Sequence, residues 1–174
     1  LAYAMEWVEG HTLAQVIVNG RPIGNMRAPE YQAMHGRMRA AACEAYDRLA
    51  SRYQCIVLEG AGSPAEINLQ KSDFVNMAMA EHAGAKVLLV ADIDRGGVFA
   101  SILGTVEHIP ARQRHLLAGI LINKFRGDVN LLTAGLREIE ALTGIPVWGV
   151  LPWLRDLAIE EEDSLGLEGR RQRT

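Results

Sequence analysis

The sequence lacks long apolar runs: no stretch approaches the roughly 20 apolar residues of a membrane helix. Its first residues include Glu6 and Glu9 but no basic residue, which is not typical of a signal peptide. Cysteine is scarce, because only Cys43 and Cys55 occur, in a spacing that fits neither a metal site nor a disulfide framework. We therefore expect two buried thiols, a cytoplasmic location and no membrane partner. The absence of an initiator Met suggests a fragment.

Charge of one sign is not in large excess, since the 174 residues carry a formal net charge of -3. This balance gives no overall attraction to nucleic acid, so we expect no nucleic-acid partner. Hydrophobic residues at 49% and charged residues at 22% are typical of a soluble globular domain with a sizeable core.

Two catalytic signatures are also absent. A phosphate-binding P-loop reads G-x-x-x-x-G-K-[ST], and no lysine follows a glycine among Lys71, Lys86 and Lys124. Neither cysteine lies in a glycine-rich elbow, so no glutaminase or protease nucleophile is visible. The sequence therefore holds at most part of a nucleotide site, without the loop that cradles the phosphates.

Four short apolar runs predict strands covered on both faces, because they do not alternate cleanly with polar residues. The runs are CIVLE (55–59), KVLLVAD (86–92), LAGILINK (117–124) and VWGVLP (147–152). A further stretch, AQVIVNG (14–20), predicts a strand at an edge, or one that pairs with parts the chain lacks.

Helical patterns separate these runs. Apolar residues at three- and four-residue steps, together with capping residues, predict helices over 28–53, about 72–83, 98–108 and 129–142. We expect Ser72 or Asp73 to cap the second helix, Asp128 to cap the fourth, and Gly84 and Gly144 to end them. This alternation predicts an α/β fold with a doubly wound, mostly parallel sheet.

Polar residues follow these runs at the carboxyl edge of the predicted sheet, where open parallel sheets bind ligands. In strand order they are Glu59, then Asp92 with Asp94, then Asn123 with Lys124, whereas the fourth run ends at the apolar Pro152. Glu59 beside Gly60 and Gly62 suits Mg²⁺ that bridges phosphates, since Mg²⁺ takes oxygen ligands and glycine allows close backbone approach. The alternative is a glutamate that only caps the next turn.

Two of these stretches suit binding of charged or polar groups. DIDRGG (92–97) offers Arg95 and backbone N–H groups to an anion at a helix N-terminus, and the alternative is a surface salt bridge. NKFRGD (123–128) offers the Asn123 amide to a purine edge, and the alternative is an ordinary turn before a helix.

Several long strings together resemble one enzyme family. VLEGAGSPAEINL, VNMAMAEHAGAKVLLVADIDRGGVFASILGTV, GILINKFRGDVNLL and LTGIPVWGVLPWL occur in order, flanked by AQVIVNGRPIGNM and EEDSLGL. They closely resemble cobyric acid synthase, the glutamine-dependent amidotransferase family of cobalamin biosynthesis.

The resemblance implies a P-loop NTPase fold of dethiobiotin synthetase type, followed by a class I glutaminase domain. It implies amidation of the b, d, e and g carboxylates of the corrinoid adenosylcobyrinic acid a,c-diamide, giving adenosylcobyric acid. ATP and Mg²⁺ would activate each carboxylate as an acyl phosphate, which ammonia from glutamine would displace. Whether the protein forms a homodimer stays open.

Residue by residue, Glu59 resembles the family's magnesium carboxylate. The expected nucleotide contacts are Gly60, Gly62, Asn123, Lys124 and Pro152. The residues expected to face the substrate carboxylate or the phosphates are Glu66, Asp92, Asp94 and Arg95.

Against the family pattern, residues 14–155 would form part of the ATP-dependent amidoligase domain, lacking its N-terminal P-loop segment. Residues 1–13 would be an atypical N-terminal segment, and 156–174 a charged linker toward a missing glutaminase domain. We expect this fragment alone to be inactive. Two other interpretations stay open: a partition-type ATPase switch, which would need a P-loop lysine, and an inactive truncated remnant.

Overall fold

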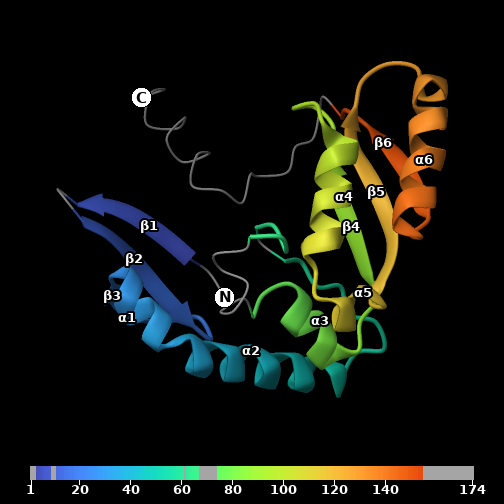
Figure 1. Cartoon of the computed structure of the whole chain (residues 1–174). Helices are drawn as coiled ribbons and strands as arrows, with labels where there is room; N and C mark the ends of the chain where they lie inside the picture. Colours follow the sequence, from blue (N-terminus) through green and yellow to red (C-terminus); the bar gives the residue numbers. More distant parts are fainter. Residues whose placement is uncertain (1–2, 9–10, 61, 67–73, 155–174) are drawn as a thin grey trace. The chain divides into compact units, whose positions relative to one another are not determined.

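The computed structural model describes residues 3–8, 11–60, 62–66 and 74–154 (Figure 1). The described residues divide into two compact units, one that ends at Ile56 and one that begins at Val57. Within the described residues, no helix has the length and hydrophobicity needed to cross a membrane. The charged tail lies outside the described residues.

The first unit contains an antiparallel sheet of β1 (Tyr3–Val8), β2 (His11–Val18) and β3 (Arg21–Met26), in that order. The strand predicted at 14–20 is confirmed in part by β2, but its predicted place at an edge or beside missing parts is wrong, because β2 pairs with both neighbours. The cause is a tight turn at Asn19 and Gly20, which both have positive φ (53° and 75°) and return the chain beside β2.

The long predicted helix at 28–53 forms as two helices, α1 (Ala28–Ala33) and α2 (His35–Ala50). Glu30 accepts a hydrogen bond from the Arg27 backbone N–H at 2.8 Å, which caps the start of α1. The break falls at Met34, just before Gly36, and glycine is a poor helix former.

The second unit contains the parallel sheet. Its strands are β4 (Val87–Asp92), β5 (Leu117–Phe125) and β6 (Val147–Pro152), hydrogen-bonded in the order β4-β5-β6. These three predicted strands and the α/β class are confirmed.

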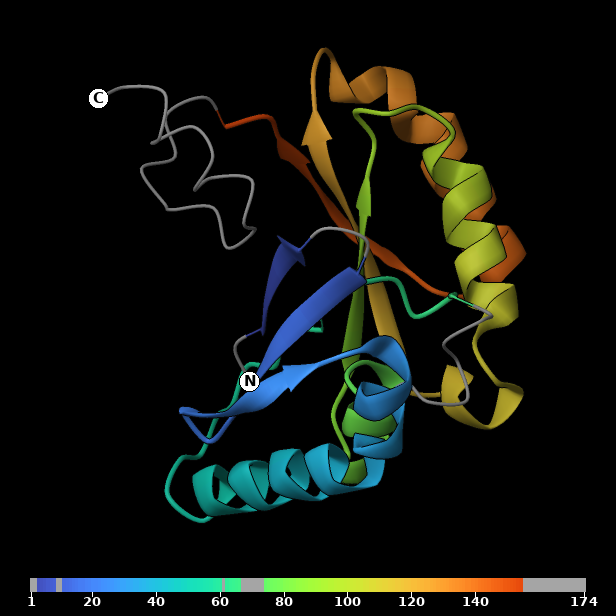
Figure 2. The same ribbon diagram turned by 90° about the vertical axis from the view of Figure 1, so that its left-hand side faces the viewer.

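Helices α4 (Val98–His108) and α6 (Thr133–Thr143) lie side by side on one face of this sheet (Figure 2). Gly135 allows their close approach, because a Cβ there would meet the Phe99 ring at 2.7 Å. The buried core between helices and sheet includes Ala91, Val98, Ile102, Val106, Ile120, Ile122 and Ile139.

Shorter helices complete the second unit: α3 (Met77–Ala83), α5 (Ala111–Arg114) and the 3-10 helix η1 (Val129–Leu132). Glu81 of α3 binds Arg112 at 2.7 Å and the buried Gln113 at 2.8 Å, which joins α3 to α5. The predicted stops at Gly84 and Gly144 are confirmed, since both end helices in the left-handed conformation.

Of two predicted helix starts, one differs from the structure, and the cap predicted at Asp128 is confirmed on a 3-10 turn. The residue before α3 is Asn76, whereas the expected caps Ser72 and Asp73 lie outside the described residues. The Asp128 carboxylate accepts from the Asn130 N–H at 2.9 Å, so it caps η1 and not an α-helical turn.

The opposite face of the sheet exposes apolar side chains, so the expectation that these strands are covered on both faces does not hold for the described residues. Leu88 and Val90 alternate with the core residues of β4, and Val90 is 54% exposed. Trp148 of β6 lies across Gly119, where a Cβ would come within 2.6 Å of its ring. A side chain on residue 119 would therefore displace the indole.

The predicted strand at 55–59 is wrong, because residues 55–60 form no regular structure. An apolar run becomes a buried strand only beside a pairing neighbour, and no described strand pairs with it. Val57 is accordingly 90% exposed. Cys55 is exposed and Cys43 half-buried, so the expectation of two buried thiols is also wrong, although both cysteines are free.

Candidate functional site at the carboxyl edge of the parallel sheet

The ends of β4, β5 and β6 bring the predicted site residues to one edge. Asp92 of β4 stands in register with Asn123 of β5, and Phe125 of β5 with Pro152 of β6. Backbone bonds extend this pairing past the strands, since the N–H of Ile93 donates to the carbonyl of Asn123 at 3.1 Å. The hydrogen-bonded ends of β4, β5 and β6 therefore form a platform from which these side chains project.

Asp92 and Lys124 form an ion pair across this platform, with 2.7 Å between Lys124 Nζ and Asp92 Oδ2. The other Asp92 oxygen accepts the backbone N–H of Asp94 at 2.8 Å. The Lys124 hydrogen bond, followed by that from the Asp94 N–H, lowers the pKa of Asp92 below its ordinary value. Asp92 is thus a carboxylate already held by donors on both oxygens.

The backbone at Lys124 has an uncommon conformation for a side-chain-bearing residue, with φ of +63°. The Asn123 side-chain oxygen accepts the Lys124 N–H at 2.9 Å, which gives this donor a partner where the ladder is irregular. The amide nitrogen of Asn123 has no hydrogen-bond partner among the described residues. It therefore remains a donor for a ligand.

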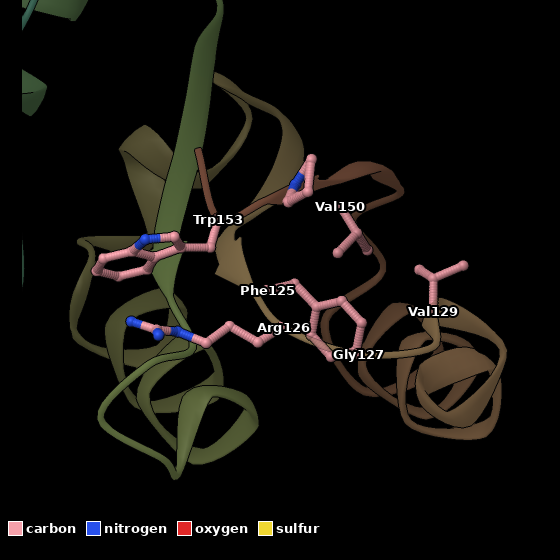
Figure 3. Close-up of a pocket in the computed structure, with 7 residues that line it drawn as sticks. Phe125, Arg126, Gly127, Val129, Val150 and Trp153 are labelled. Atoms are coloured by element: carbon pink, nitrogen blue, oxygen red, sulfur yellow. The ribbon is translucent and has the colours of Figure 1, made fainter. Parts of the chain in front are cut away.

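Asp94, Arg126 and Trp153 form a second connected group. Arg126 Nε lies 3.1 Å from Asp94 Oδ1, and the guanidinium carbon lies 3.7 Å from the Trp153 ring centroid. The backbone N–H of Trp153 donates to the carbonyl of Phe125 at 2.8 Å, which holds the Trp153 backbone beside the end of β5. Figure 3 shows the Arg126 side chain extended along the indole face.

A cavity of about 360 Å³ lies beside this group (Figure 3). It has aromatic, apolar and guanidinium walls and lies next to the strand-end charges. A volume of this size is at the low end for small-molecule sites. Its lining residues are Phe125, Arg126, Gly127, Val129, Val150, Pro152 and Trp153.

Arg95 is the cation at this edge without a partner. It is exposed and forms no hydrogen bond or ion pair with the rest of the described chain, whereas Lys124 and Arg126 each bind a carboxylate. Its charge nevertheless contributes to the lowered pKa of Asp92. Gly96 and Gly97 follow it with φ of 78° and 69°, and Gly97 begins α4.

The segment from Glu59 to Glu66 lies outside the sheet. Gly60 packs against the Asn76 side chain, which leaves no space for a Cβ, and Gly62 has φ of 77°. The Glu66 carboxylate turns back toward Gly62, because a Cβ there would lie 3.7 Å from its Oε1. Within the described residues, neither glutamate bonds to the strand-end groups.

Comparison with known proteins decides the family. The AAA_26 family model, described as an AAA domain, matches residues 24–161 of this chain.

The chain belongs to this AAA domain family. It is also 56% identical over 160 residues to cobyric acid synthase of Bacteroides fragilis, a match that covers 91% of this chain and 32% of that protein. Cobyric acid synthase of Mycobacterium tuberculosis is 51% identical over 158 residues, with the same two coverages. The chain thus spans about a third of the length of these curated relatives. No solved structure matches it.

Among the carboxylates of this AAA domain, Glu59 suits a hard cation better than the carboxylates at the strand ends. Within the described residues, no three His, Cys, Asp or Glu side chains gather closely enough to hold a metal. Asp92 and Asp94 already bind cationic side chains, whereas Glu59 is exposed and forms no hydrogen bond within the described chain. A single free carboxylate fits Mg²⁺, which usually keeps waters and takes phosphate oxygens.

Of the predicted site residues, the AAA domain brings together Asp92, Asp94, Asn123, Lys124 and Pro152, with Arg95 adjacent. It leaves Glu59, Gly60, Gly62 and Glu66 on a separate segment. Sequence reasoning missed Arg126 and Trp153, although both follow a strand at the same edge. The signal that could have identified these two residues is their position directly after β5 and β6.

Proposed function

We propose that this chain is part of an ATP-dependent carboxylate amidoligase of corrinoid biosynthesis. The finer proposal is amidation of the b, d, e and g carboxylates of adenosylcobyrinic acid a,c-diamide, in the cytoplasm, with ammonia derived from glutamine. Similarity to proteins named cobyric acid synthase supports the family, and the charged strand-end platform supports the chemistry.

The observation that supports this chemistry is that two of the cations at this edge already bind carboxylates, whereas within the described residues the third does not. Lys124 and Arg126 neutralise Asp92 and Asp94, which leaves Arg95 free beside glycines that begin a helix. Activation of a carboxylate by ATP brings two anions together, so a free cation is needed where they meet. Arg95 suits this task because its planar fork binds two oxygens at once.

The proposed reaction has two steps. A carboxylate oxygen of the corrinoid attacks the γ-phosphorus of ATP, the bond to ADP breaks, and an acyl phosphate forms. Ammonia then attacks the acyl carbon, phosphate leaves, and the nitrogen loses a proton, which gives the amide. Asp92, Asp94 and Glu66 would face the substrate carboxylate or the phosphates, and Arg95 would offset the negative charge.

The nucleotide would extend across the platform. Its base would enter the cavity between Phe125 and Pro152, with the Asn123 amide nitrogen as a donor to a ring nitrogen. Lys124 would approach the phosphates, as would the backbone at Gly60 and Gly62. Glu59 would hold Mg²⁺, which when bound offsets negative charge on phosphate oxygens.

The other two-thirds of the relatives' length would supply what this sequence does not contain. We propose that it includes a P-loop before residue 14 and a glutaminase domain joined through residues 156–174, in a protein that is monomeric or homodimeric. Ammonia would pass from that glutaminase to the acyl phosphate.

Mass spectrometry of the corrinoid tests this proposal. The complete protein that carries this chain should convert the a,c-diamide to products with successive amidations, and only with ATP, Mg²⁺ and either glutamine or ammonium. The 174-residue chain alone should bind MgATP weakly or not at all by calorimetry. Absence of amidation with ammonium would refute the synthetase assignment, and clear micromolar binding by the chain alone would refute the need for a separate P-loop.

A further inference from the structure

The guanidinium of Arg126 connects the cavity wall to a strand-end carboxylate. Its Nε faces Asp94 at 3.1 Å, while its plane lies on the Trp153 ring with 3.7 Å to the centroid. Asp94 follows β4, Arg126 follows β5 and Trp153 follows β6. One side chain therefore joins the ends of all three parallel strands.

The ion pair alone does not explain so specific an arrangement. The Arg126 side chain is 56% exposed and Asp94 39%, and ion pairs at such exposure contribute little because water screens them. Stacking on an indole adds an attraction that depends on a flat guanidinium. The backbone bond from Trp153 to Phe125 anchors the residue that carries the indole to the end of β5. Trp153 therefore determines where the Arg126 charge lies.

We propose that Arg126 is a positioning residue that links occupancy of the cavity to the placement of Asp94. Both Arg126 and Trp153 line the cavity, so a flat base bound there contacts the stack and restrains it. The restrained guanidinium holds the Asp94 carboxylate in place, one residue before Arg95 in the chain. This inference rests on the proposed function for its kinetic consequence, but its structural part does not.

The structural part is tested on the 174-residue chain by NMR of the Arg126 Nε–H. Its signal should carry a ring-current shift that Trp153→Ala removes and Trp153→Phe largely keeps, and Asp94→Asn should also move it. Trp148→Ala is the matched control, because Trp148 lies at the start of the same strand and packs on Gly119. A signal that Trp153→Ala leaves unchanged would overturn the inference.

The kinetic part is tested in the complete protein. Trp153→Ala should lower kcat for amidation by about three- to tenfold, as loss of a cation–π contact predicts. Trp153→Phe should recover most of that loss, and Trp148→Ala should stay within about twofold of the original chain. Trp153→Ala and Asp94→Asn should have less than additive effects, since both act through Arg126. Thermal melting of each variant separates unfolding from mispositioning.

The outcomes distinguish the two proposals. Additive effects, or a Trp153→Phe variant as slow as Trp153→Ala, would overturn the positioning role even if amidation occurs. A complete protein without amidation activity would overturn the proposed function and, with it, the kinetic role of Arg126, whatever the NMR result.

Discussion

Lys124 Nζ lies 2.7 Å from Asp92 Oδ2, which ties together the ends of two neighbouring parallel strands. Lys124 has a left-handed backbone, and the Asn123 side-chain oxygen accepts the Lys124 N–H at 2.9 Å. Backbone strain of this kind commonly occurs at functional sites. The pair therefore belongs to the candidate site as well as to the fold.

The Asp92–Lys124 pair predicts a pH-dependent contribution to stability. Because the pKa of folded Asp92 is lowered, its contribution is present above the ordinary pKa and disappears as pH falls through the folded value. Asp92→Asn should lower stability at neutral pH by at most about 1 kcal/mol, given the exposure of the pair. Thermal melts should show this difference shrinking below about pH 4.

The control for this titration is Glu138→Gln, an exposed change on α6 where no ion pair is found in the described chain. It should leave stability nearly the same across the pH range. If the Asp92→Asn deficit stayed constant down to pH 2, the ion pair would not be its source.

Glu59→Gln tests the magnesium carboxylate. The change keeps the shape of the side chain but removes its charge, so in the complete protein amidation should fall about a hundredfold or more, since metal–phosphate stabilisation contributes several kcal/mol. Glutaminase activity, assayed separately, should persist. Normal use of ATP and corrinoid by this variant would rule out the metal role.

Arg95→Lys tests the free cation of the platform. Lysine keeps the charge but loses the fork that bridges two oxygens, so steady-state amidation should slow while the melting temperature stays nearly unchanged. Arg137→Lys on α6 is the matched control, and its rate should equal that of the original chain. An unchanged rate for Arg95→Lys, or a loss explained by melting, would make Arg95 a surface residue without a catalytic role.

Two glycine substitutions test the helix layer that supports the site. Gly135→Ala should destabilise the chain by about 1–3 kcal/mol, because the added Cβ would meet the Phe99 ring at 2.7 Å. Gly104→Ala should instead raise stability by up to about 1 kcal/mol, since nothing lies within 4 Å of its Cβ and alanine favours helix. Denaturant unfolding of both variants measures the sign, and equal signs would contradict this packing.

The sequence by itself determined the parallel strands and the edge at which the polar residues gather. β6 has the predicted bounds, 147–152, and helix ends at Gly84 and Gly144 were predicted from glycine's tolerance of positive φ. These features depend on local chain chemistry. The direction of parallel strands then places Asp92, Asn123 and Pro152 at a common edge.

Only the tertiary structure decided which cation binds which carboxylate and whether an apolar run becomes a strand. Residues 55–59 have a strand-like composition, but no strand of the described residues pairs with them, so the run stays irregular. Arg126 reaches Asp94 and Trp153 because three separate strands end side by side. Pairing and stacking join residues far apart in the chain, and their geometry arises only when the sheet assembles.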